Sequence, residues 1–153
     1  MGNTGVLRAE ALALRRSARI SSWWWVPVAV VAVYWPCLGA GLVYDDWINF
    51  DRNQALRERD WWALLTQPYY APDTTYWRPL TSLAMAFAYQ LGPAGVHALA
   101  MLCHASAALV VGAIARQLFG DARLATFAAL LFAVSPLQVE SVAWASALPG
   151  VPA

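Results

Sequence analysis

Residues 79–115 read PLTSLAMAFAYQLGPAGVHALAMLCHASAALVVGAIA and carry no formally charged side chain. At about 1.5 Å of rise per residue, a single helix of this stretch would be about 55 Å long, whereas the hydrocarbon core of a bilayer is roughly 30 Å thick. The stretch must therefore be divided, and Gly92-Pro93-Ala94-Gly95 is the natural break because Gly and Pro end helices. The sequence thus predicts a short helix over 79–91 and a membrane-spanning helix from about Val96 to Ala115.

The short helix expected over 79–91 is amphipathic. Its large apolar side chains fall on one helical face and its polar side chains lie elsewhere; the two sets are Leu80, Leu83, Phe87 and Leu91, and Thr81, Ser82, Tyr89 and Gln90. This pattern is typical of a helix that lies in the membrane interface with its apolar face toward the acyl chains.

A further apolar run, 124–139, follows a polar turn, 116–123, that contains Gly120 and Asp121. The run is short for a span and contains Pro136. We expect it to form a third helix that returns antiparallel to the second, with the chain leaving the membrane near Ser135-Pro136. Both ends of this hairpin then lie on the same side of the membrane.

The first expected span covers residues 23–43, which carry no formal charge and are long enough to cross a bilayer. Because Arg8, Arg15, Arg16 and Arg19 precede it, a cleaved signal peptide is an alternative to an uncleaved anchor. The anchor is favoured, since the apolar stretch exceeds a signal core and Gly39-Ala40-Gly41 is a weak cleavage site. Pro36 is expected to kink the outer half of this helix.

The composition agrees with a membrane protein. Of the 153 residues, 60% are hydrophobic and 12% are charged, and the mean hydropathy is +0.47; these values exclude disorder. A formal net charge of +1 provides no field that would recruit nucleic acid, so no nucleic-acid partner is expected. Cys37 and Cys103 lie in apolar runs and are expected to pack rather than to form a disulfide. The predicted fold is an all-α polytopic membrane protein with about three transmembrane helices and an outer loop containing the interfacial helix.

Arginine placement orients the spans. The leader 1–22 and the turn 116–123 together hold six arginines, whereas the loop 44–95 holds four and opens with Asp45, Asp46 and Asp51. Arginine is enriched on the cytoplasmic side. We therefore expect the N-terminus and the turn to be cytoplasmic, the segments 44–95 and 140–153 to lie outside, and the membrane to be a bacterial inner membrane.

Two adjacent carboxylates, Asp45 and Asp46, directly follow the first span and are thus held at the outer membrane surface. Charge at this position is costly, which points to a function. Carboxylates act as general bases where lower polarity and a neighbouring like charge increase their affinity for a proton. The alternative is a solvated loop opening, because Asp is common in turns.

Glu140 follows the third expected span on the same outer side, so three carboxylates can converge there. The alternative is a helix-start acid. Ser135-Pro136 can open a short surface helix, and the amino end of a helix favours negative charge.

Arg78 stands in Tyr76-Trp77-Arg78-Pro79-Leu80, at the start of the interfacial helix. At headgroup depth its planar, five-donor guanidinium suits a phosphate. The alternative is an arginine that reaches ordinary lipid phosphates.

His97 and His104 are seven residues apart and share one face of the second span. They are candidates for substrate binding, for a proton relay or for hydrogen bonds between helices, and the last is favoured. The rings are about 10 Å apart along the helix axis and no third ligand has a helical spacing, so no metal site is expected. In the outer loop, Trp61-Trp62 either stack on a sugar or, as we favour, anchor the loop at the interface.

Read together, these motifs resemble the amino-terminal part of the C-type (GT-C) membrane glycosyltransferases, and most closely the protein O-mannosyltransferase-like proteins that carry tetratricopeptide repeats. The resemblance rests on Val43-Tyr44-Asp45-Asp46, on Tyr76-Trp77-Arg78-Pro79-Leu80-Thr81, on His97 and His104, and on the run 131–144 with Ser135-Pro136 and Glu140. It covers residues 43–147.

The resemblance implies that a mannose-like sugar moves from a polyprenyl-phosphate carrier to an acceptor hydroxyl, on protein, at the outer face of the membrane. Asp45 or Asp46 matches the base that accepts the hydroxyl proton, and Glu140 the acid that orients the acceptor or supports the base. Arg78 matches a contact to the carrier phosphate. His97 and His104 complete the substrate-binding candidates, and the expected partners are membrane lipid and the lipid-linked donor.

Two departures from the family pattern matter. Ser135 stands where relatives usually have His before the proline, and three predicted spans are far fewer than family enzymes contain. We therefore expect the chain to be an N-terminal piece that needs further helices of the same or another chain. The competing hypothesis is a non-catalytic membrane remnant or subunit that binds isoprenoid phosphate. A small transporter-like subunit is disfavoured because no internal repeat is present.

Overall fold

The computed structural model describes residues 23–43, 46, 50, 53–68 and 77–144, and within these ranges the regular structure is entirely helical. The all-α class is thereby confirmed, while Asp45 and the leader 1–22 lie outside the described residues. The elements are α2 (Trp25–Tyr34), the 3-10 helix η1 (Trp35–Gly39), α3 (Gln54–Glu58), α4 (Trp61–Thr66), α5 (Pro79–Tyr89), α6 (Pro93–Phe119), α7 (Ala122–Ala133), the 3-10 helix η3 (Pro136–Gln138) and α8 (Val139–Ala143).

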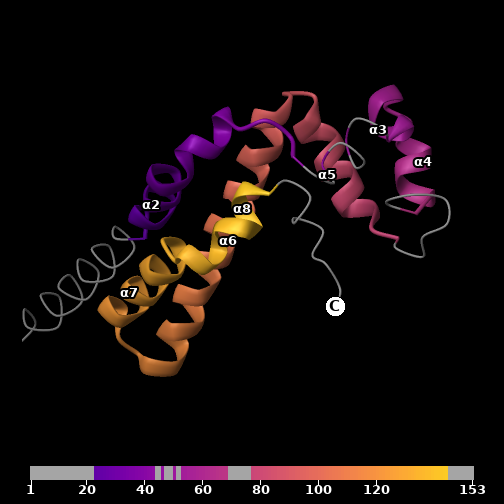
Figure 1. The fold of residues 1–153 in the computed structure, drawn as a ribbon. Helices are drawn as coiled ribbons and strands as arrows, with labels where there is room; N and C mark the ends of the chain where they lie inside the picture. Colours follow the sequence, from indigo (N-terminus) through magenta and orange to yellow (C-terminus); the bar gives the residue numbers. More distant parts are fainter. Residues whose placement is uncertain (1–22, 44–45, 47–49, 51–52, 69–76, 145–153) are drawn as a thin grey trace, which may run out of the picture.

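Helices α2, α6 and α7 form a bundle in which α6 runs antiparallel to the other two (Figure 1). The buried core of this bundle, which we call the bundle core, consists of Val26, Val30, Tyr34, Met101, Ala105, Ala108, Ala129, Ala133 and Val142. A Cβ placed on Gly112 would lie 3.0 Å from the Cβ of Ala129. Because small residues let helix backbones approach closely, α6 and α7 pack as the expected antiparallel hairpin.

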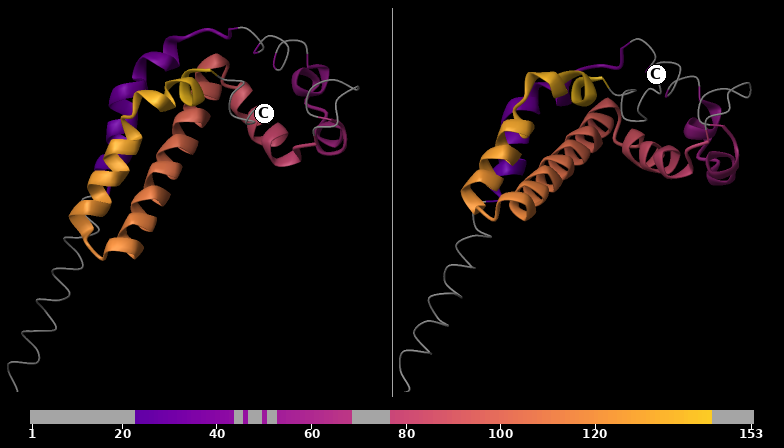
Figure 2. Two further views of the ribbon diagram at one scale, coloured as in Figure 1. Left: turned by 60° about the horizontal axis from the view of Figure 1, so that its bottom comes forward. Right: turned by 90° about the horizontal axis from the view of Figure 1, so that it is seen from below.

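The segment before α6 forms a second packed unit. Its buried side chains come from Phe50, which precedes α3, and from α3, α4, α5 and the first turn of α6; they are Phe50, Leu56, Leu64, Met85, Ala86, Ala88 and Val96. Figure 2 shows α5 leaving the upper end of α6 and carrying α3 and α4 away from the bundle. The described part of the segment before α6 is therefore a helical subdomain that packs on the start of α6.

The corner between α5 and α6 depends on two glycines. Gly92 has a φ of +72°, in the left-handed region that side chains other than Gly rarely adopt. A Cβ on Gly95 would collide with the carbonyl oxygen of Ala88 and lie 2.7 Å from the Cβ of Leu91. The predicted break at 92–95 is thus correct, and Gly95 is the residue that lets the two helices touch.

The first expected span is shorter than the predicted 23–43. The α-helix ends at Tyr34, continues as η1 to Gly39, and leaves 40–43 non-helical. The cause is Pro36, which lacks an N–H and stands at the start of η1, so the regular hydrogen-bond ladder cannot continue. The expected kink in this half is therefore observed as a tightened 3-10 turn.

The boundaries of the other two expected spans also differ from the prediction. Helix α6 begins at Pro93, where a missing N–H costs nothing in the first turn, and it ends at Gly120 with a φ of +69°. Helix α7 begins after Asp121, whose Oδ1 accepts hydrogen bonds from Arg123 N and Leu124 N, and it ends at Ala133 rather than at 139.

Of the helices in the described ranges, α6 is the one that is long and apolar enough to cross a membrane by itself. The segments Ala122–Ala133 and Pro136–Ala143 pass the same test together but are bent by 49°, and Trp25–Gly39 and Pro79–Tyr89 are shorter apolar helices. By length and composition α6 could cross a membrane, whereas three crossings stay a prediction.

Two helices of the outer loop were not predicted. Helix α3 is capped by Asn53, whose side chain accepts from Leu56 N, and α4 is capped by Asp60, whose side chain accepts from Ala63 N. Such caps satisfy amide groups that a short helix leaves unpaired. Asn53 and Asp60, each directly before the first residue of its helix, were the available signal in the sequence.

Candidate functional site

Asp46 is fully buried, although it is an acid in the segment that follows η1. Its Oδ2 accepts a hydrogen bond of 2.8 Å from Val43 N, and its own amide donates to Val43 O at 3.0 Å. This turn holds the carboxylate against the chain that leaves η1. Asp45, the other member of the predicted pair, lies outside the described residues.

Glu140 lies in the first turn of α8 and is exposed. The same short helix is anchored by Val142, which is buried in the bundle core. The alternative prediction of a short surface helix that begins with Glu140 after Ser135-Pro136 therefore matches α8. An acid in the first turn is stabilised by the amide groups there, so this position does not by itself distinguish a catalytic from a structural carboxylate.

Asp46 and Glu140 belong to segments that meet at the same end of α6. Leu42, shortly before Asp46, packs on the cluster that contains Val96 from the first turn of α6. Val142, two residues after Glu140, packs with Met101. In both views of Figure 2, α8 and the chain after η1 lie beside the upper end of α6. The segments that carry the two acids thus lie beside the same end of α6.

Arg78 occupies the N-cap position of α5 and is half-buried. Its carbonyl oxygen accepts from Ser82 N at 2.9 Å and from Ser82 Oγ at 3.1 Å. Helix α5 has 11 residues, so Arg78 stands about 16 Å along the helix axis from the corner with α6. The acids gather near the start of α6, whereas the arginine lies at the far end of α5.

An apolar pocket of about 220 Å³ lies between α5 and α6. Leu80, Thr81, Ala84 and Met85 line it from α5, and Leu99 and Cys103 line it from α6. Leu80, one of these lining residues, follows Arg78 by two residues in the chain. An apolar pocket of this kind suits a hydrocarbon chain.

His104 makes the predicted interhelical hydrogen bond. Its Nε2 lies 3.0 Å from the carbonyl oxygen of Ala133, the last residue of α7. The ring also contacts Tyr34 edge-on at 5.3 Å between centroids and stacks on Phe132 at 5.4 Å. Tyr34 donates from its hydroxyl to Ser135 O at 3.3 Å. Sequence reasoning missed Tyr34, although a phenol at the end of an apolar helix was a usable signal.

His97 behaves differently from His104, and no interhelical hydrogen bond to it is seen among the described residues. It is fully buried, and neither ring nitrogen has a hydrogen-bond partner within the part of the chain that the structure describes. An unpaired buried polar group is costly, so such a group calls for an explanation. His97 lies in the second turn of α6, at the end where the two acids gather.

The outer loop presents aromatic side chains on its surface. Trp61 of α4 stacks on Phe87 of α5 with a centroid distance of 5.2 Å, and Trp77 Nε1 donates to Leu65 O at 2.8 Å. Trp62 and Trp77 are 74% and 63% exposed. These contacts join α4 and α5 into one aromatic surface. Across the described residues, no three His, Cys, Asp or Glu side chains are grouped to hold a metal ion.

Comparison with known proteins identifies the relatives of this chain. It is 33% identical to protein O-mannosyl-transferase TMTC3 of Mus musculus over 74% of the chain. It is 31% identical to protein O-mannosyl-transferase Tmtc2 of Drosophila melanogaster over 72%, and 29% identical to protein O-mannosyl-transferase F38B6.6 of Caenorhabditis elegans over 72%. No protein-family model and no solved structure matches.

The aligned part is a small share of each relative, because the chain spans 13% of the length of the mouse and fly proteins and 18% of the nematode protein. The names of these relatives agree with the resemblance that the motifs around Asp46, Arg78 and Glu140 indicated. The chain is therefore a homologue of the protein O-mannosyl-transferases, and it corresponds to a part of their length.

Proposed function

We propose that the chain is part of a membrane glycosyltransferase that moves a mannose-like sugar from a polyprenyl-phosphate carrier to a hydroxyl group on a protein acceptor. The printed names of the relatives support a protein O-mannosyltransferase. The observation that carries the proposal for this chain is that the segments of Asp46 and Glu140 both pack at the end of α6 where His97 is buried without a hydrogen-bond partner among the described residues.

In this proposal the carboxylates orient and deprotonate the acceptor hydroxyl. The acceptor oxygen attacks the anomeric carbon, its proton passes to the carboxylate of Asp46 or Asp45, and the bond between that carbon and the phosphate oxygen breaks. Glu140 orients the acceptor or supports the base. His97 supplies a hydrogen bond to a bound hydroxyl or phosphate, which gives its buried ring nitrogens the partner that the described residues lack. The leaving phosphate carries the negative charge away.

Arg78 and the pocket between α5 and α6 are assigned to the donor. A guanidinium stabilises the charge that develops on a leaving phosphate, and the apolar pocket accepts the first carbons of the carrier chain. Leu80 and Met85 from α5 and Leu99 from α6 provide that lining. Confinement of donor and catalytic groups to one interface raises their effective concentration. Since Arg78 and the acids stand apart, the bound donor must extend from α5 toward the start of α6.

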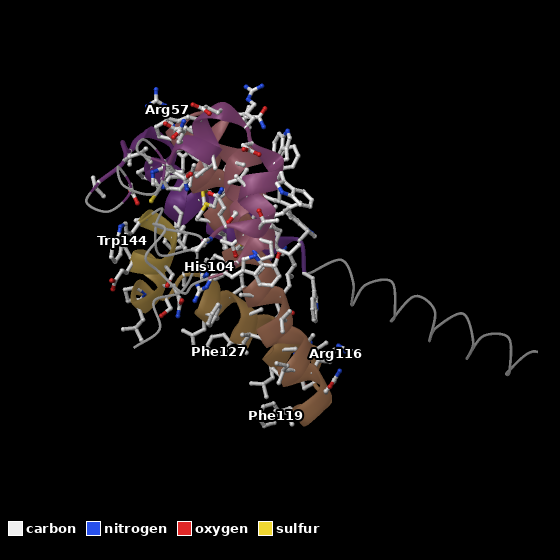
Figure 3. The ribbon with its side chains drawn as sticks, turned by 90° about the vertical axis from the view of Figure 1, so that its right-hand side faces the viewer. Arg57, His104, Arg116, Phe119, Phe127 and Trp144 are labelled. Atoms are coloured by element: carbon white, nitrogen blue, oxygen red, sulfur yellow. The ribbon has the colours of Figure 1, made fainter. Side chains whose placement is uncertain are left out.

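We further propose three membrane crossings, by α2 with η1, by α6 and by α7. In Figure 3, Arg116 at the end of α6 and Arg57 of α3 lie at opposite ends of the molecule. This separation supports a cytoplasmic side that holds the N-terminus and the turn after Phe119, and an outer side that holds the acids. A bacterial inner membrane is the proposed location.

The aromatic surface of α4 and α5 supports an interfacial position for the outer subdomain. Trp62, Trp77 and Phe87 are exposed, and Trp and Tyr are enriched where a membrane meets water. We propose that this surface lies in the headgroup layer. Large exposed side chains on α6 and α7, including Leu118 at 72% and Phe127 at 64%, then face lipid or further helices of the same or another chain.

A non-catalytic role is the second candidate. The chain covers 13% of the mouse relative, and the pocket beside Arg78 would still hold an isoprenoid phosphate without catalysis. In that case the chain is a lipid-phosphate-binding subunit or remnant, and the acids have structural roles. Transfer by the purified 153-residue chain alone would exclude this candidate.

The test uses the gene in its full-length context and measures transfer of labelled mannose from polyprenyl-phosphate mannose to protein. Asp46→Asn and Glu140→Gln should each lower kcat by about 100-fold or more, as expected for loss of a general base or its support. Glu58→Gln is the matched control, because Glu58 is an exposed acid on α3. Unchanged transfer in Asp46→Asn together with Asp45→Asn would remove the base assignment.

A further inference from the structure

The chain changes direction where α7 ends, and this change determines where Glu140 lies. Helix α7 ends at Ala133, and the segment Pro136–Ala143 continues at 49° to it. Pro136 has no N–H to donate, so the helix cannot run on, and carbonyl groups of its last turn are left without intrahelical partners. Such groups need donors from elsewhere in the fold.

Two side chains from other helices make hydrogen bonds to carbonyl groups at this bend, where Ser135 O also accepts from Gln138 N at 3.1 Å. His104 of α6 lies with Nε2 at 3.0 Å from Ala133 O, and Tyr34 of α2 donates its hydroxyl to Ser135 O at 3.3 Å. His104 therefore carries its proton on Nε2. The two carbonyls flank the bend, one on the last residue of α7 and one directly before Pro136.

The two donors are themselves held in place. Tyr34 is 2% exposed and His104 is 7% exposed. Their rings contact each other, and the His104 ring stacks on Phe132 of α7. On the far side of the bend, Val142 of α8 is buried in the same bundle core as Tyr34. Side chains of α2, α6 and α7, namely Tyr34, His104 and Phe132, thus pack together at the joint between α7 and α8.

We propose that Tyr34 and His104 are positioning residues for Glu140: they hold the α7–α8 joint at one angle and so fix the place of the carboxylate at the outer end of α6. This inference rests on the proposed function of Glu140. Neither residue contacts the acceptor in this assignment, so His104 acts through the backbone of α7 instead of through the substrate.

Packing by itself makes a different prediction from positioning by hydrogen bonds. A Leu at position 104 fills much of the same space but leaves Ala133 O without a donor, and Tyr34→Phe removes a single oxygen. A Gln at position 104 retains an N–H group. If the donors hold the joint, Gln preserves the angle while Leu and Phe release it; if packing alone holds it, all three variants behave alike.

The first measurement is the distribution of distances between spin labels at positions 118 and 141 of the full chain in nanodiscs. Cys37 and Cys103 are replaced beforehand so that only these two positions carry labels. Leu118 and Ser141 are exposed, on α6 and α8. His104→Leu and Tyr34→Phe should widen the distribution at least twofold. His104→Gln should keep the parental width, as should Ser106→Ala, because the Ser106 hydroxyl bonds only within α6. Equal widths in all variants would overturn the proposal.

The second measurement is transfer in the full-length context. His104→Leu should lower kcat by about 10- to 100-fold, the cost of misplacing a group by about 1 Å, while KM for the lipid-linked donor stays the same and His104→Gln restores kcat. Adding Glu140→Gln to His104→Leu should cause little further loss. If Glu140→Gln alone leaves transfer intact, the proposed function fails and the label distances still test the joint. If Glu140→Gln abolishes transfer while His104→Leu does not affect it, the positioning role fails.

Discussion

The corner at Gly95 links the position of Arg78 to the bundle, and Gly95→Ala tests this link. In the first turn of α6, a Cβ at position 95 would meet the carbonyl oxygen of Ala88, with the carbonyl carbon at 3.1 Å and the Leu91 Cβ at 2.7 Å. Ordinary carbon contacts are about 3.5–4.0 Å. Two of these three atoms are backbone, which cannot rotate away, so α5 has to move by about 1 Å.

The size of the effect follows from the length of α5. Helix α5 ends at Tyr89, and Arg78 lies ten residues before Ala88, or about 15 Å farther from the corner along the axis at 1.5 Å per residue. A tilt about the corner that moves Ala88 by about 1 Å therefore moves Arg78 by more than that. Misplacement by about 1 Å can already cost about 100-fold in rate. Transfer should consequently fall by about 100-fold in the full-length context.

The sign of the change in the free energy of unfolding provides an independent test. At an unconstrained helix position, Gly→Ala stabilises by about 1 kcal/mol, whereas overpacking against backbone costs about 1–3 kcal/mol. We expect Gly95→Ala to destabilise the chain by about 1–2 kcal/mol in chemical unfolding in detergent micelles. Gly41→Ala is the matched control, because no atom lies within 4 Å of the Cβ it would add and its φ is not positive.

A result opposite in sign would refute the reasoning about this corner. If Gly95→Ala unfolds at higher denaturant concentration than the parent, as helix propensity alone predicts, and transfer is unchanged, then α5 does not press on residue 95. If transfer is lost while the distance between spin labels on α5 and α6 stays the same, then displacement of Arg78 by a movement of α5 is not the cause.

Three further outcomes are expected. His97→Leu should leave the free energy of unfolding unchanged or higher, because it removes two buried nitrogens that have no partner among the described residues. Transfer should fall by about tenfold or more. A lower free energy of unfolding with full transfer would assign His97 to the fold alone. Asp121→Ala should lower the free energy of unfolding by about 1 kcal/mol, since the N-cap of α7 is lost, and an unchanged denaturation midpoint would deny that role. In vesicles of phosphatidylcholine brominated near the headgroups, Trp62→Phe should reduce the quenched part of the tryptophan fluorescence; equal quenching in both proteins would place this side chain away from the interface.

Local features of the chain were predictable because they depend on neighbours in sequence. The uncharged run 79–115, the break at Gly92-Pro93 and the turn at Gly120-Asp121 each limit where a helix can begin and end. They predicted the helix before the corner, the long helix after it and the antiparallel return of α7. The motifs around Asp46, Arg78 and Glu140 also indicated the family, since a resemblance between sequences requires no coordinates.

The sequence by itself thus determined the helical class, the helices on either side of the corner at 92–95 with Arg78 at the start of the first, and the similarity to protein O-mannosyl-transferases. The tertiary structure alone decided that Asp46 turns back onto Val43, that α3 and α4 form in the segment before α5, and that His104 bonds to α7 while His97 finds no partner among the described residues. The reason is physical: helical periodicity places two histidines on one face. Which of them meets a carbonyl depends on where Pro136 ends a different helix.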